Sequence, residues 1–133
     1  MVTWEVRTAE AFGHEFERIG LEGAQGILAT ADAVHYALRS QVVRHASRLR
    51  LPAVYPVDEW VDAGGLASYG TNVADQFRRA AGFVDKILRG AKPADLPVEE
   101  PTNFELALNM KAAREQGIKL PQSVLVRATK GVE

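Results

Sequence analysis

Short apolar runs alternate regularly with longer amphipathic segments along this 133-residue chain, and this pattern leaves few folds open to it. The apolar runs at residues 24–30, 51–55 and 66–70 have the length and continuity of buried parallel strands. The segments between them carry apolar residues every three or four positions, as helices that cover a sheet do. The chain therefore predicts an α/β fold in which helices flank a mostly parallel sheet.

Local signals give the expected order of elements. Helices are predicted where a capping side chain precedes an amphipathic segment, and they end near glycine. They are expected at residues 8–20, 32–49, 72–89, 110–116 and 121–129, with a helical turn at 57–61. Two further strands are predicted at residues 2–6 and 104–109. The Pro-rich residues 91–102 are expected to form an extended connector.

Composition excludes several classes of function. A net charge of −1 gives no broad attraction to nucleic acid or to an anionic lipid surface. No apolar run approaches the roughly 18 residues of a spanning helix, so no direct membrane insertion is expected. The chain has no cysteine, and His14, His35 and His45 lack the spacing of metal ligands. The sequence thus predicts neither a metal site nor a cofactor, and structural or surface roles for the three histidines.

A small α/β enzyme of flavodoxin-like or hydrolase type is the least favoured alternative. Such an enzyme needs a phosphate-binding loop or a base-activated nucleophile. Ser68 lies outside any G-x-S-x-G frame, and Gly64-Gly65 is not followed by the pattern of a phosphate loop. The chain is therefore predicted not to be an enzyme.

A long part of the chain, from Arg50 to Leu120, resembles a known family. The resemblance rests on the run from Arg50 to Pro56, the run from Glu59 to Gly70, and the run from Phe77 to Leu106. These runs are similar to the C-terminal portion of ABC-type substrate-binding proteins with the type I periplasmic-binding fold, whose relatives include aromatic-amino-acid binders. The resemblance implies a small organic ligand held between two α/β lobes, an ABC permease as partner, and a periplasmic location.

Laid on the plan of that family, the chain divides into two segments. Residues 1–63 resemble a βαβαβ part of the second lobe. Residues 64–133 resemble the return into the first lobe and include the Pro-rich connector 91–102. The segments are expected to form one compact or swapped unit that is part of the type I fold. The first residues resemble no secretion signal, which predicts a cytoplasmic location for the chain in this form.

Candidate ligand-binding residues follow the predicted strands. Ser68, Tyr69 and Gly70 precede a capped helix, where hydroxyl groups and backbone N–H groups bind polar head groups; the alternative is a simple strand-to-helix turn. Asp32 is either a helix N-cap or, by the resemblance, a carboxylate that pairs with a ligand ammonium group. Tyr36 either stacks on the ligand or covers the sheet.

Aromatic side chains at the end of the second predicted strand are further candidates. Tyr55 is expected to contact a planar or apolar ligand, with core packing as the alternative. For Trp60, which lies in the following turn, core packing is favoured over ligand contact.

The helix at residues 72–89 carries an apolar stripe that must be buried somewhere. The stripe consists of Val73, Phe77, Ala80, Ala81, Val84 and Leu88. Packing on the chain's own sheet or on a second copy would cover it, and a homodimer is predicted. This leaves an alternative to a solute-binding function, namely a truncated remnant that acts only as a self-associating structural fragment.

Overall fold

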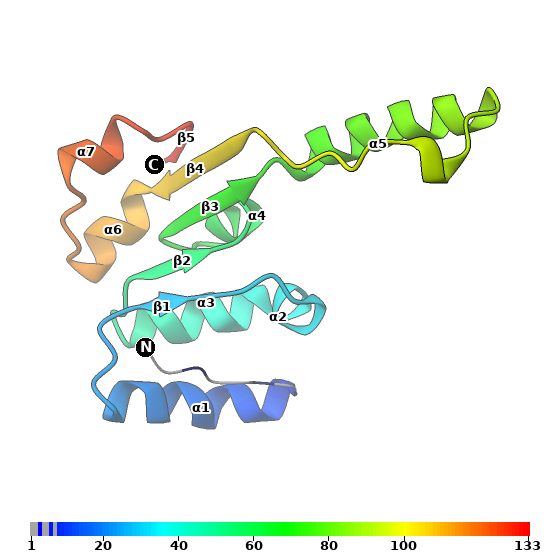
Figure 1. Ribbon diagram of the computed structural model, residues 1–133. Coiled ribbons are helices and arrows are strands. Elements are labelled where there is room, and N and C mark those ends of the chain that lie inside the picture. The colour runs from blue at the N-terminus through cyan, green and yellow to red at the C-terminus, as the bar shows by residue number, and fades with distance from the viewer. Residues whose placement is uncertain (1–2, 4–5, 7) are drawn as a thin grey trace.

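The computed structural model describes residues 3, 6 and 8–133, and of residues 9 and 10 the backbone only. The predicted strand at residues 2–6 therefore lies mostly outside the described residues. A single five-stranded sheet runs through the molecule in the order β1-β2-β3-β4-β5 (Figure 1). Its strands are β1 Ile27–Leu28, β2 Ala53–Tyr55, β3 Ala67–Thr71, β4 Phe104–Asn109 and β5 Lys130–Val132.

The pairing within the sheet is mostly parallel, as the sequence predicted. Neighbouring strands are parallel from β1 to β2, from β2 to β3 and from β4 to β5. The β3–β4 pair is antiparallel, with Ser68 opposite Ala107 and Gly70 opposite Glu105. The chain reverses between these two strands by way of a long helix and the connector, which extend away from the sheet (Figure 1).

Helices occupy the predicted segments with three differences. They are α1 Ala9–Leu21, α2 Ala33–Ala37, α3 Arg39–Arg48, α4 Glu59–Asp62, α5 Val73–Leu88, α6 Met110–Gln116, α7 Gln122–Leu125 and the 3-10 turn η1 Pro93–Asp95. The helix predicted at 32–49 is interrupted at Leu38, so it forms α2 and α3. The connector contains η1, and the last predicted helix is shorter than expected because the chain continues into β5.

Capping side chains begin the helices where the sequence predicted. Thr8, Asp32 and Asn72 each accept a hydrogen bond from a backbone N–H of the first helical turn. These bonds satisfy donors that have no partner within the helix. Glycine ends a helix as predicted at the C-terminus of α6. Gly117 there adopts a left-handed conformation with φ 70°, which glycine adopts without steric cost.

Two apolar clusters form the core. The first joins α1, α3, β2 and α4 around Phe16, Val43 and Trp60. The second joins β3, β4 and α6 around Leu66, Leu108 and Ala113. The first cluster lies against β2 and the second against β3 and β4, so each stabilises one half of the sheet.

Two of the three histidines have structural contacts, as predicted. The Nε2 atom of His35 lies 3.2 Å from the carbonyl oxygen of Val6, and its ring meets the edge of Phe12. His45 stacks on Phe16 with 5.3 Å between ring centroids. Burial, with two nearby arginines, lowers the pKa of His45 and favours its neutral form.

Lys130 connects the last strand to α4. Its Nζ atom lies 2.8 Å from Oδ2 of Asp58 and 3.0 Å from a carboxylate oxygen of Asp62. The hydrogen bond from Lys130 lowers the pKa of Asp58, and the two carboxylates raise the pKa of Lys130. This ion-pair cluster fastens β5, the strand that the sequence did not predict, to the helix beside β3.

Replacing Lys130 with methionine should cost less than about 1 kcal/mol at neutral pH, because the cluster is partly exposed. The pKa of Asp58 is lower in the folded state than in the unfolded state. The ion pair with Lys130 therefore stabilises the fold fully at pH values above the unfolded-state pKa, and this stabilisation is lost as the pH falls through the folded-state pKa. The stability difference between native and variant proteins should therefore shrink from pH 7 to about pH 3, as measured by urea unfolding. Lys111→Met, at an exposed 3.9 Å ion pair, is the control. An equal difference at both pH values would contradict this assignment.

Candidate functional site

A depression lies at the carboxyl ends of the three consecutive strands β1, β2 and β3. Its volume is about 350 Å³, within the range of small-molecule sites. Its lining comes from the segment after β1, the segment after β2 and the first residue of α5: Ala31, Asp32, Ala33 and Tyr36; Pro56, Val57 and Trp60; and Val73. In open α/β sheets, ligands bind at this edge because the loops there converge on one space.

Asp32 contributes the charged group of this depression. Its Oδ1 atom accepts hydrogen bonds from the backbone N–H groups of Val34 at 2.8 Å and His35 at 3.2 Å. These two bonds, that from His35 first, lower the pKa of the carboxyl group. The side chain is therefore a carboxylate at neutral pH, and it confirms the predicted cap of α2. Both bonds end on Oδ1, which leaves Oδ2 to meet a further donor.

Tyr36 forms an aromatic wall one helical turn after Asp32. The ring is half exposed and lines the depression from α2. The guanidinium group of Arg39 lies over this ring, 4.8 Å from its centroid, and donates a hydrogen bond to the Tyr36 carbonyl oxygen. The cation therefore holds the ring in place while part of its surface stays open to the depression.

Tyr55 and Ser68 lie deeper in the sheet. Each is 2% exposed, and the two residues are register neighbours on β2 and β3. The Tyr55 ring stacks on Trp60 at 4.8 Å and 13°, and burial raises the pKa of its phenol. In this chain both side chains thus lie beneath the surface, and neither lines the depression.

Tyr69 and Gly70 lie at the end of β3. Tyr69 is 52% exposed and stacks on Phe104 of β4, with 5.7 Å between ring centroids. Gly70 passes so close to the β2–α4 loop that a Cβ atom there would lie 1.8 Å from the carbonyl oxygen of Pro56. Because Gly70 has no Cβ atom, β3 can approach the β2–α4 loop closely, and this contact sets the position of Pro56 in the depression.

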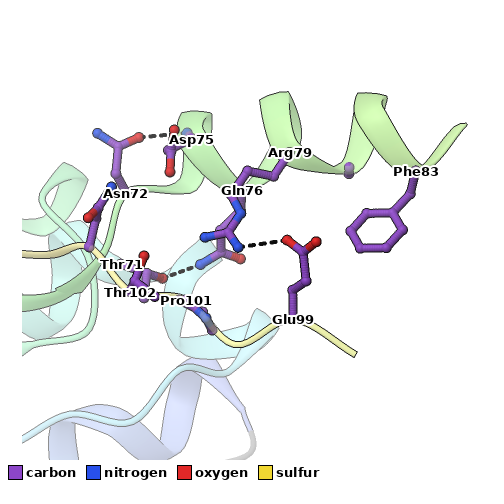
Figure 2. A pocket seen from close by; sticks show the side chains of 11 residues that line it. Thr71, Asn72, Asp75, Gln76, Arg79, Phe83, Glu99, Pro101 and Thr102 are labelled. Carbon is purple, nitrogen blue, oxygen red and sulfur yellow. Dashed lines mark hydrogen bonds and ion pairs between the residues drawn. The ribbon is translucent and has the colours of Figure 1, made fainter. Parts of the chain in front are cut away.

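A second, smaller hollow of about 190 Å³ lies between α5 and the connector (Figure 2). Arg79 donates a hydrogen bond to Glu99 at 2.7 Å, which lowers the pKa of the glutamate, and Gln76 donates to Thr71. Asn72 donates to Glu105 at 3.0 Å while capping α5. The bond from Arg79 joins α5 to the connector, whereas the other two join the start of the helix to β3 and β4.

The structure therefore brings together two of the six sequence candidates, Asp32 and Tyr36. Five lining residues were missed because they are ordinary apolar residues without a chemical signature: Ala31, Ala33, Pro56, Val57 and Val73. Their one signal was position, since each follows a predicted strand at its carboxyl end. Trp60 also lines the depression while being 1% exposed, which confirms its predicted core packing.

The sequence profile that describes ABC transporter substrate binding proteins matches residues 19–132. The chain belongs to this family. The resemblance read from residues 50–120 is thereby confirmed over nearly the whole chain. Among curated protein sequences, none matches this chain.

Solved structures of this fold agree with the family assignment. An ABC domain from Streptococcus pneumonia in complex with L-Trp has 26% identity and a TM-score of 0.89, over 98% of this chain and 44% of that one. A conserved domain protein from Vibrio cholerae has 26% identity and a TM-score of 0.84, over 92% and 41%. A ligand-free, open substrate binding protein with adhesive properties from Clostridium difficile shares the fold at 18% identity and a TM-score of 0.69, over 99% and 43%.

This member of the substrate-binding family thus spans between 41% and 44% of the length of the structures it matches. Within the described part of the chain, no three His, Asp or Glu side chains gather as a metal site would require. Of the helices that the structure describes, none is long and apolar enough to cross a membrane.

Proposed function

We propose that this chain carries ligand-contacting elements of the solute-binding component of a bacterial ABC importer. The ligand is a small organic molecule, either an amino acid or an aromatic compound. The observation that carries the proposal is the depression at the carboxyl ends of β1, β2 and β3 in a chain of a substrate-binding family. Binding and release of a solute need no covalent step, so the proposed role is not enzymatic.

The chemistry of the depression supports this class of ligand. The Asp32 carboxylate has an oxygen available for an ammonium group, and charge-assisted hydrogen bonds of this kind are the stronger ones. The Tyr36 ring and the apolar side chains of Val57 and Val73 suit an aromatic or aliphatic portion beside it. The L-Trp complex of the pneumococcal relative supports an amino acid as the first compound to test.

The two segments of the chain have different proposed roles. Residues 1–63 contribute a βαβαβ part of one lobe, and residues 64–133 contribute the return into the other lobe. The separate apolar clusters on either side of the β2–β3 pair support this division. Ser68, Tyr69 and Gly70 stay proposed ligand-contacting residues on the second segment, and Tyr55 on the first.

The proposed partners follow from the family. Closure of two lobes around the solute would be followed by docking on an ABC permease, which places the proposed site of action in the periplasm. The family match supports both proposals. No nucleic acid and no direct membrane insertion belong to this mechanism.

Binding is best tested on the chain by NMR titration, which detects weak as well as tight complexes. The probes are L-tryptophan, other L-amino acids and aromatic carboxylic acids, with sorbitol as the negative control. Ligand binding should move the amide resonances of residues 31–36, 56–60 and 73, and should raise the melting temperature by mass action. If no compound of these classes shifted those resonances, the proposed function would be abandoned.

Replacing Asp32 with asparagine separates its two roles. Asparagine caps helices as well as aspartate does, so α2 and the melting temperature without ligand should be unchanged. The charge is lost, and affinity for a ligand with an ammonium group should fall about tenfold. Titration calorimetry measures the change, with Asp32→Ala as the variant that loses both cap and charge. An unchanged affinity in D32N would mean that the carboxylate serves only as the cap.

A further inference from the structure

Tyr36 is held both at its backbone and at its ring. Its N–H group donates a hydrogen bond to the Asp32 carbonyl oxygen at 2.9 Å, and Nη1 of Arg39 donates one to the Tyr36 carbonyl oxygen at 3.1 Å. The same guanidinium group lies over the ring, 4.8 Å from its centroid. One side chain, that of Arg39, therefore contacts both the main chain and the ring of a residue that lines the depression.

Arg39 reaches this position at a break between two helices. Leu38 ends α2 with φ −99° and ψ 12°, and Arg39 is the first residue of α3. The last carbonyl groups of a helix lack partners within that helix, and a basic side chain is a favourable partner for them. The guanidinium group thus caps the end of α2, and this bond keeps it over the Tyr36 ring.

The Arg39 side chain lies outside the depression. Tyr36 is one of the residues that line the depression, and Arg39 is not. Tyr36 is 42% exposed, whereas Arg39 is half-buried. The cation therefore covers the ring from a side turned away from the depression, and it leaves a surface of the ring for the solute.

A cation behind an aromatic ring changes what the ring binds in front. A guanidinium group within about 6 Å of the centroid is attracted by the negative face of the ring and draws its electron density. The open surface of Tyr36 is then a poor site for a second cation and a good site for a neutral, electron-rich ring. Such aromatic pairs gain more than their buried area alone supplies, whereas an aliphatic group gains from the area only.

Asp32 complements this arrangement at the other end of α2. Its Oδ1 atom accepts both capping hydrogen bonds, so Oδ2 can meet an ammonium group of the solute. Arg39 disfavours the same ammonium group on the Tyr36 ring because the two cations repel. The charged end of a solute is thereby directed to Asp32 and its apolar end to Tyr36.

We propose that Arg39 is a positioning residue that makes this site select an aromatic solute over an aliphatic one of the same shape. It acts through the Tyr36 ring and does not itself need to touch the solute. This selection rests on the proposed solute-binding function, of which it is a refinement. All the contacts involved lie within residues 32–39, so the arrangement does not depend on what packs against α5.

Two matched solutes test the selection by NMR titration of the chain. L-phenylalanine and 3-cyclohexyl-L-alanine carry the same charged groups, and only the first has an aromatic ring. Arg39→Met should weaken the binding of L-phenylalanine about fivefold and that of cyclohexylalanine less than about twofold. Arg39→Lys keeps the charge at the helix end and loses the planar contact, so it should lower the preference for L-phenylalanine about threefold. Arg44→Met, at an exposed position of α3, is the matched control and should leave both affinities unchanged.

A double-variant cycle shows whether Arg39 acts through the ring. In the Tyr36→Leu background, Arg39→Met should have no further effect on the ratio of the two affinities. The amide spectrum without solute shows that each variant is folded. An equal loss of affinity for both solutes in Arg39→Met, or the same change of ratio with and without Tyr36, would overturn the role of Arg39 and leave the solute-binding function standing. Failure of every solute to bind the native chain would instead overturn the proposed function, and the role of Arg39 with it.

Discussion

Replacing Gly70 with alanine is expected to destabilise the fold by about 3 kcal/mol, at the upper end of the usual cost of overpacking. The added Cβ atom would lie 1.8 Å from the Pro56 carbonyl oxygen and 3.0 Å from its carbonyl carbon. Both obstacles are backbone atoms, so β3 and the β2–α4 loop would have to separate. The melting temperature should fall by about 10 °C for a chain of this size.

Gly82 supplies the control for this prediction, and its effect should have the opposite sign. A Cβ atom at Gly82 meets nothing within 4 Å, and the residue lies inside α5. Alanine is favoured over glycine in a helix by about 0.5–1 kcal/mol. Thermal unfolding of Gly70→Ala and Gly82→Ala together separates a close backbone approach from a general effect of added methyl groups. An unchanged melting temperature for Gly70→Ala would contradict the close approach of β3 to Pro56.

Replacing Trp60 with alanine is expected to cost about 3–5 kcal/mol, the largest effect of any single truncation proposed for this chain. The side chain is 1% exposed and stacks on Tyr55, so its removal leaves a cavity between β2, α4 and the floor of the depression. Urea unfolding measures the loss of stability.

Two further variants show which property of Trp60 matters. Trp60→Phe keeps the stack on Tyr55 and should cost only about 1–2 kcal/mol, because the indole Nε1 has no hydrogen-bond partner among the described residues. Tyr69→Ala removes a half-exposed ring and should cost less than about 1 kcal/mol. If Trp60→Phe proved as costly as Trp60→Ala, the indole N–H would have a partner that the structure does not contain.

The secondary structure could be predicted wherever a local signal decides it. Thr8, Asp32 and Asn72 start helices because their side chains bond to the first free N–H groups. Gly117 ends α6 because its backbone turns left-handed. The strand β5 was missed because Lys130–Val132 is short and partly polar. It exists because Ala107 and Leu108 of β4 offer an edge to pair with, and no local window contains that information.

The candidate site could be predicted only where a local signal marked the residue. Asp32 and Tyr36 follow a recognisable strand and carry distinctive chemistry, so position and residue type agreed. The depth of Tyr55 and Ser68 depends on how α4 covers the sheet, which periodicity does not show. Val57 and Val73 entered the site only because parallel strands bring distant loops to one edge.

The α/β class, the helix starts and the family follow from the sequence alone, since each rests on neighbouring residues or on a long continuous match. The apolar side of α5 follows from the sequence as well, because a period near 3.6 residues places those side chains together. Which side of α5 the connector covers is shown by the folded chain alone, since it depends on where the connector returns. The connector packs on the side that carries Arg79, where the ion pair with Glu99 holds it, and leaves Phe77 exposed.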